Sequence, residues 1–147
     1  MRSINSIQDE IIDEFSMLEG NLDMCVEYLI DLGKKMEPLN QQQHVDDNIV
    51  KGCQSKVWLV ANKENGQVTY QADSNTMITK GLVSMLIRVL SGHTADDILN
   101  ADLYFINRIG MNRFIGTQRS NGLAAMIKQM KLYALAFMAK EQKKESS

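Results

Sequence analysis

The strongest constraint on the fold is a segment with strand character inside a chain whose other apolar residues recur at helical spacing. Residues 57–61 and 68–72 are rich in β-branched and aromatic side chains, and Asn65-Gly66 lies between them. Asn and Gly tolerate the positive φ angles of a tight two-residue turn, so this pattern predicts a β-hairpin. We expect an α+β domain, in which helices pack on a small antiparallel sheet of about three strands.

Helical periodicity flanks the hairpin on both sides. Apolar stripes predict a helical hairpin over residues 4–32, a helix over 78–89 and a long last helix that begins at Thr117. Gly33 follows the stripe of the second helix and is expected to end it in a left-handed cap. The polar run at 40–48 is expected to be an exposed loop.

Composition indicates a single domain with its own core. The chain has 147 residues, of which 44% are hydrophobic and one is proline, and we place the domain at 1–139 with a charged, disordered tail at 140–147. The net charge of −2 disfavours nucleic acid as a partner. No stretch is apolar enough to span a membrane and the N-terminal segment is acidic, so we expect a cytoplasmic protein.

The two cysteines differ in context. A reducing compartment disfavours a disulfide between them. Cys25 falls on an apolar helix stripe, where a free cysteine behaves as a small hydrophobe. Cys53 lies between a loop and a strand, next to Gly52, which lets another part of the backbone approach closely. Lys51 and Lys56 flank it and are expected to favour its thiolate form, which makes Cys53 the candidate reactive thiol.

Other chemistries lack the residues that they need. A zinc site takes four ligands at characteristic spacings, whereas the chain offers only Cys25, His44, Cys53 and His93 without paired spacing. A cysteine hydrolase would need His44 or His93 beside Cys53, and both histidines are expected to be solvated. There is no glycine-rich phosphate loop. We therefore expect neither a metal nor a bound cofactor.

The residues around Cys53 also carry a family resemblance. The run Gly52-Cys53-Gln54-Ser55-Lys56-Val57-Trp58 closely resembles the signature of the SufE family, the sulfur acceptors of bacterial iron–sulfur cluster assembly. Residues 29–35, 73–81 and 119–123 resemble further family segments, so the likeness spans roughly residues 22 to 127. Asn75, Thr76 and the run 116–118 depart from the usual family pattern.

The resemblance implies a fold similar to that of IscU-type scaffolds and a persulfide-forming role for Cys53. A family member accepts sulfur from a SufS-like cysteine desulfurase that depends on pyridoxal phosphate, stimulates that enzyme, and delivers the sulfur towards a scaffold such as a SufB-containing complex. With one thiol in the motif, the chain lacks the several cysteine ligands of a cluster and is expected to be a carrier. Association as a homodimer stays open.

Secondary roles follow from the same interpretation. Gly52 is a candidate hinge, and the surface around Lys51, Gln54, Ser55 and Lys56 is the candidate docking site for the partner. Arg119 and Lys80 are candidates to steady a thiolate or to contact the partner, with Asp73 holding one of them, although an ordinary helix-end ion pair explains these residues equally well. A thiol-dependent hydrolase and a non-catalytic module that activates a desulfurase remain alternative functions.

Overall fold

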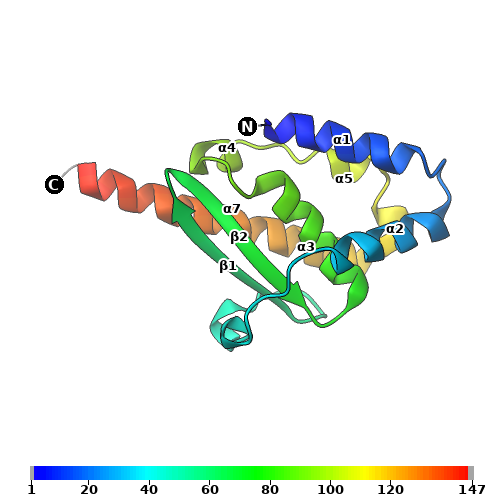
Figure 1. Cartoon of the computed structure of the whole chain (residues 1–147), viewed down its shortest axis with the longest axis horizontal. Coiled ribbons are helices and arrows are strands. Elements are labelled where there is room, and N and C mark those ends of the chain that lie inside the picture. The colour runs from blue at the N-terminus through cyan, green and yellow to red at the C-terminus, as the bar shows by residue number, and fades with distance from the viewer. Residues whose placement is uncertain (1, 146–147) are drawn as a thin grey trace.

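The computed structural model describes residues 2–145 and has the expected α+β architecture (Figure 1). Among these residues no helix is both long enough and apolar enough to cross a membrane. The elements follow in the order α1 (Ile4–Ser16), α2 (Leu22–Lys34), the 3₁₀ turns η1 (Gln41–Gln43) and η2 (Asp46–Asn48), β1 (Val57–Glu64), β2 (Gln67–Ser74), α3 (Met77–Leu90), α4 (Ala95–Leu99), α5 (Phe105–Arg108), α6 (Asn112–Ile115) and α7 (Thr117–Glu145).

The predicted hairpin is confirmed, with its turn where the sequence placed it. β1 and β2 pair antiparallel, and Glu64 and Gln67 are the last partners before the turn. Asn65 and Gly66 have φ angles of 52° and 79°, the left-handed region that a tight hairpin turn requires.

The expected number of strands is wrong, because the described sheet has two strands and not about three. Both outer edges carry only isolated bridges, from Ile49 to Trp58 and from His93 to Val68. Ile49 follows directly on the turn η2, and His93 follows Gly92, whose φ is +85°. At each edge the chain makes one bridge and then turns away, so neither edge gains a third strand.

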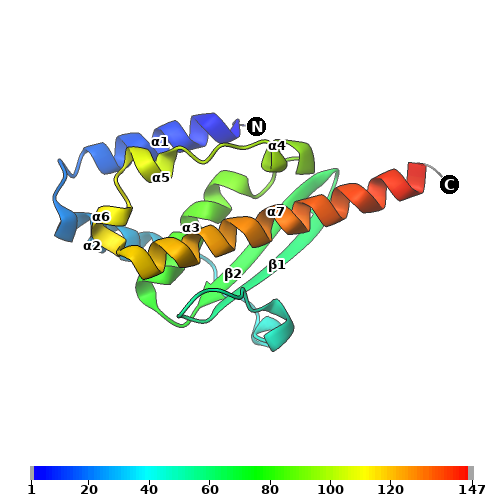
Figure 2. The ribbon, with the colours of Figure 1, turned by 180° about the vertical axis from the view of Figure 1, so that it is seen from behind.

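One face of the hairpin forms the core with α3 and α7. Figure 2 shows α7 crossing in front of the sheet, and Figure 1 shows α7 passing behind the strands with α3 alongside β2. Side chains of this face alternate along each strand, as the two-residue period of a strand requires, and Val57, Leu59, Val68 and Ala72 are at most 2% exposed. The Tyr70 hydroxyl donates a hydrogen bond of 2.6 Å to the Met130 carbonyl and fixes the sheet to α7.

Two glycines allow α2 and α3 to cross closely, which corrects the expected role of Gly33. The helix continues to Lys34, so Gly33 lies inside α2 and is not a left-handed cap. A Cβ on Gly33 would lie 2.7 Å from the backbone nitrogen of Gly81. A Cβ on Gly81 would lie 2.2 Å from the Leu29 carbonyl oxygen, so neither position has room for a side chain.

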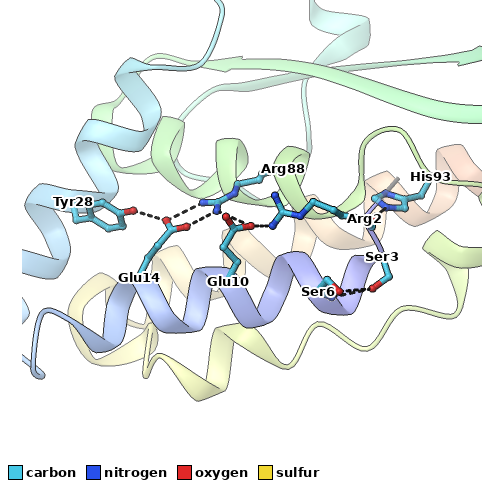
Figure 3. A network of polar contacts seen from close by, with 8 residues as sticks. All are labelled: Arg2, Ser3, Ser6, Glu10, Glu14, Tyr28, Arg88 and His93. Carbon is cyan, nitrogen blue, oxygen red and sulfur yellow. Dashed lines mark hydrogen bonds and ion pairs between the residues drawn. The ribbon is translucent and has the colours of Figure 1, made fainter.

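A polar network joins the first three helices (Figure 3). Arg88 of α3 donates to the Glu14 carboxylate of α1, with Nη1 at 3.0 Å from Oε1, and the Tyr28 hydroxyl of α2 donates to the same carboxylate. The hydrogen bond from Arg88 lowers the pKa of Glu14 by more than burial raises it. Burial and the bond to Glu14 raise the pKa of Tyr28 to about 12. The network therefore holds a charged pair and a neutral phenol at neutral pH.

The last helix is longer than expected. The sequence predicts a tail from Lys140, whereas α7 continues to Glu145. Ser146 and Ser147 of that predicted tail lie outside the described residues.

The crossing of α2 and α3 predicts that Gly81→Ala destabilises the protein. A methyl group there meets the Leu29 carbonyl, and relieving such overpacking costs about 1–3 kcal/mol in free energy of unfolding. Urea denaturation followed by circular dichroism measures the change. Met77→Ala, at a position on α3 that is 52% exposed, is the control and should stay within about 0.5 kcal/mol of wild type. Equal stability of the two variants would contradict the packing argument.

Candidate functional site

The residues 51–56 that carry Cys53 form a loop closed at its base. The Val50 N–H donates to the Val57 carbonyl at 2.8 Å, just outside the two ends of the loop. Asn75, at the end of β2, accepts from the Lys56 N–H through its side chain at 2.9 Å and donates from its own N–H to the Lys56 carbonyl at 3.2 Å. These three bonds fix where the loop leaves and rejoins the sheet.

Within this loop, Cys53 lies directly on helix α7. The thiol donates to the Gly122 carbonyl oxygen at 3.4 Å. Gly122 has no side chain, and a Cβ there would lie 3.4 Å from the sulfur, so the cysteine packs closely on the backbone of α7. Gly52 has a φ of +97°, and a Cβ on it would lie 3.2 Å from that of Ala125. The loop conformation therefore suits glycine at position 52.

Burial sets the protonation state of the thiol in this conformation. Cys53 is partly buried, and its burial raises the pKa of the thiol above the ordinary value. The Gly122 carbonyl accepts its hydrogen and would repel a thiolate. Lys51 and Lys56 are exposed, and the expected lowering of the Cys53 pKa by these lysines is not found. Cys53 is thus a neutral thiol at rest.

The thiol lines a pocket of about 350 Å³ between the loop, α3 and the start of α7. Gln54, Ser55 and Arg119 line the same pocket, so the structure brings these three predicted residues together with Cys53. Arg119 is exposed and donates to the Ile115 carbonyl at 3.2 Å. The hydroxyl of Ser55 accepts from those of Thr76 at 2.8 Å and Thr79 at 3.3 Å, which fixes the far side of the loop.

Sequence reasoning missed Thr79 and Gly122 as parts of the pocket. Both lie inside segments that carry the family resemblance, which was the available signal, but only the packing of α3 and α7 shows that they meet Cys53.

Asp73 and Lys80 form a second group, which does not line this pocket. Lys80 Nζ lies 3.2 Å from Asp73 Oδ1, so Asp73 holds the lysine and not Arg119. Burial raises the pKa of Asp73, but hydrogen bonds from His44, the Ser74 N–H and Lys80 outweigh it, and the pKa is lowered overall.

The remaining cysteine and both histidines have other surroundings. Cys25 is 4% exposed, as expected for a core residue, and burial raises its pKa. The expectation of solvated histidines is wrong, because both rings are engaged with protein groups. His93 is 6% exposed, with its ring nitrogens near the carbonyls of Leu90 and Arg2, and His44 is bonded to Asp73. Within residues 2–145, no three His, Cys, Asp or Glu side chains gather as a metal site would require.

Comparison with known proteins agrees with this geometry. The model of the SufE family, described as an Fe-S metabolism associated domain, matches residues 9–134. An uncharacterised SufE-like protein of Rhizobium etli is 36% identical over 84% of this chain and 86% of its own length. A SufE-like protein of Synechocystis is 38% identical over 76% of this chain and 70% of its own length. A SufE-like protein of Arabidopsis thaliana, chloroplastic/mitochondrial by name, is 37% identical over 82% of this chain and 33% of its own.

A solved structure shares the fold. The solution structure of a hypothetical protein from Thermus thermophilus superposes with a TM-score of 0.75, covering 90% of this chain and 96% of that one. At 18% identity this likeness concerns the fold alone. The family match over residues 9–134 and the relatives at 36–38% identity show that the chain belongs to the SufE family and has a role in Fe–S metabolism.

Proposed function

We propose that this chain is a sulfur carrier in which Cys53 accepts sulfur from a pyridoxal-phosphate-dependent cysteine desulfurase and passes it towards an iron–sulfur scaffold, such as a SufB-containing complex. The observation that carries the proposal is the setting of Cys53. Its thiol lies on a closed loop at a pocket and donates only to a backbone carbonyl of α7. Such a thiol is sheltered, and a movement of one loop is sufficient to expose it.

The transfer needs no oxidant. The Cys53 thiolate attacks the outer sulfur of the partner's persulfide, and a bond forms between Cys53 Sγ and that sulfur. The bond between the two sulfurs of the partner breaks, and the partner's inner sulfur leaves with the electron pair as a thiolate. The outer sulfur keeps its hydrogen or loses it to solvent, and Cys53 becomes a persulfide.

The resting conformation protects the thiol but slows this attack. A thiol is a poor nucleophile, and burial together with the Gly122 carbonyl keeps Cys53 in that form. Contact with the desulfurase must therefore draw the loop off α7, where hydration allows the proton to leave. The same shelter limits reaction of the resting thiol with stray oxidants.

Charged residues around the loop fit a partner-binding role. Lys51 and Lys56 are exposed at the two ends of the loop, where they can meet an acidic surface of the desulfurase. Arg119 lines the pocket with Cys53 and can stabilise a persulfide anion there. Asp73 of β2 and Lys80 of α3 form an ion pair further away, beside the end of the sheet that supports the loop.

The alternative functions differ in what they need from Cys53. A thiol-dependent hydrolase requires a general base beside the sulfur, whereas His44 is bonded to Asp73 and His93 to two backbone carbonyls. A non-catalytic activator requires only a docking surface and no thiol.

Sulfur transfer predicts different behaviour of the two cysteines. After incubation with a cysteine desulfurase and cysteine, the isolated protein should be heavier by one or more sulfur atoms, on the peptide that contains Cys53. Mild reductant should remove the added mass. Cys53→Ser should abolish both the mass gain and the stimulation of the desulfurase, whereas Cys25→Ala should retain both. Intact-protein and peptide mass spectrometry make the measurement. Full stimulation by Cys53→Ser would decide for the activator, and turnover of a thioester or amide by the chain alone would decide for the hydrolase.

The shelter of Cys53 predicts that Gly52→Ala exposes the thiol. A non-glycine residue at a φ of +97° strains the resting loop by about 1–3 kcal/mol, so the loop should leave α7 more often. In a Cys25→Ala background, the rate of Cys53 alkylation by iodoacetamide should rise roughly tenfold. Gly66→Ala is the control, because Gly66 also has positive φ but lies in the hairpin turn. The shelter model fails if Gly66→Ala has the same effect, or if Gly52→Ala has none.

Electrostatic docking predicts a salt-dependent defect on charge reversal. The double variant Lys51→Glu, Lys56→Glu should slow sulfur uptake from the desulfurase, and more so in low salt than in high salt, because screening weakens interactions between exposed charges. Lys140→Glu is the control, since Lys140 lies beside the hairpin turn at the other end of β1. Initial rates of mass gain across a salt series give the comparison. An identical salt response in both variants would rule out docking through the loop lysines.

A further inference from the structure

His44 has an unusual set of neighbours on the outer face of the sheet. Its Nε2 lies 2.9 Å from Asp73 Oδ2, and its Nδ1 lies 3.1 Å from the Asn40 carbonyl oxygen. The ring also meets Trp58 edge to face, with centroids 4.7 Å apart. Trp58 and Asp73 are direct partners across the hairpin, so one histidine touches both strands.

Both ring nitrogens of His44 face groups that can only accept a hydrogen bond. A carbonyl oxygen never donates, and Asp73 is a carboxylate because its hydrogen bonds hold its pKa low. A neutral imidazole has one N–H, so it satisfies one of these two acceptors and turns a lone pair towards the other. An imidazolium has two N–H groups and satisfies both.

The surrounding charges are compatible with a positive ring. The Asp73 carboxylate contacts both His44 and Lys80. Its Oδ2 faces His44, whereas its Oδ1 lies 3.2 Å from Lys80 Nζ and accepts from the Ser74 N–H at 2.8 Å. Lys80 is thus the cation that opposes protonation of His44, while the carboxylate lies between the two. On the histidine's own segment, Asp46 and Asp47 are exposed. The Trp58 ring, which carries no charge, lies against the imidazole at an interplanar angle of 70°.

We propose that His44 is a positioning residue for the Cys53 loop, acting as a proton-dependent latch that holds segment 40–50 on the sheet. The ring closes the turn η1 through Asn40 and binds that turn to Asp73 and Trp58. The same segment continues to Ile49, which bridges to Trp58, and to Val50, which closes the base of the loop. Loosening the segment frees one of the two ends that hold Cys53 on α7.

The direction of the pH effect follows from the proton count. The closed latch carries one more proton than the open one, so a rise in pH opens it and a fall in pH closes it. At low pH the loop is held and Cys53 is sheltered. As His44 loses its proton, the bond to the Asn40 carbonyl is lost first, because the remaining N–H serves the charged Asp73 acceptor.

Trp58 provides a direct measurement, since it is the chain's one tryptophan and lies against the ring. A protonated histidine in contact quenches indole fluorescence. We expect the emission of the wild type to change as the pH is raised and the ring loses its proton. His44→Gln should lack this change. The variant retains His93, so any change in emission caused by His93 would persist in it. A titration that persists unchanged in His44→Gln would overturn the latch.

Alkylation of Cys53 tests whether the latch reaches the loop. With Cys25→Ala in both proteins, the ratio of the wild-type rate to the His44→Gln rate cancels the pH dependence of the thiol itself. Below the fluorescence midpoint the wild type should react about fivefold more slowly, the factor that corresponds to one hydrogen bond. Above the midpoint the ratio should approach one. A ratio that is constant with pH would overturn the positioning role even if the fluorescence titrates.

This inference deepens the proposed function, because it concerns access to the thiol that would carry sulfur. Neither measurement uses a desulfurase. Failure of sulfur transfer would therefore leave the latch standing, and failure of the latch would leave sulfur transfer standing.

Discussion

The hydrogen bond from the Val50 N–H to the Val57 carbonyl is the contact on which the site depends. It closes the loop at the point where the chain enters β1, so the six intervening residues cannot extend along the sheet and must bulge from it. The paired bonds between Lys56 and Asn75 fix the same end to β2. Burial of the hairpin's inner face against α3 and α7 holds this base in place. The loop therefore contacts α7 at a fixed position, where Cys53 meets Gly122.

The contact between loop and α7 balances protection against reactivity. Cys53 packs on the backbone of Gly122, and the carbonyl of the same residue accepts the thiol hydrogen. Burial keeps the thiol neutral, which suits a sulfur acceptor that must wait for its partner. Because the sheltering contacts are few and lie at one helix face, a modest movement of the loop is sufficient to reverse them. The face of the sheet that points away from α7 carries the contacts of His44 with Asp73 and Trp58.

Much of the architecture was predictable because local patterns and packing agree. The Asn65-Gly66 turn between two strand-like runs indicated the hairpin, and apolar stripes placed α1, α3 and the start of α7. The error at Gly33 has a clear reason, since glycine after a helical stripe usually ends the helix. Here the same residue stays helical because the backbone of α3 passes where its side chain would be. Nothing local distinguishes these two uses of a glycine.

The sequence by itself determined the α+β class, the family and the identity of Cys53 as the candidate reactive thiol. Turn residues, apolar periodicity and a contiguous motif are all features of short stretches of sequence. Only the tertiary structure decided how that thiol is held. Its raised pKa comes from burial against α7 and not from the lysines beside it in the chain, and its pocket joins residues from the loop, α3 and α7. His44 illustrates the same limit. In sequence it is one polar residue in a polar run, and it gains a role only when folding places two hydrogen-bond acceptors and an indole ring around it.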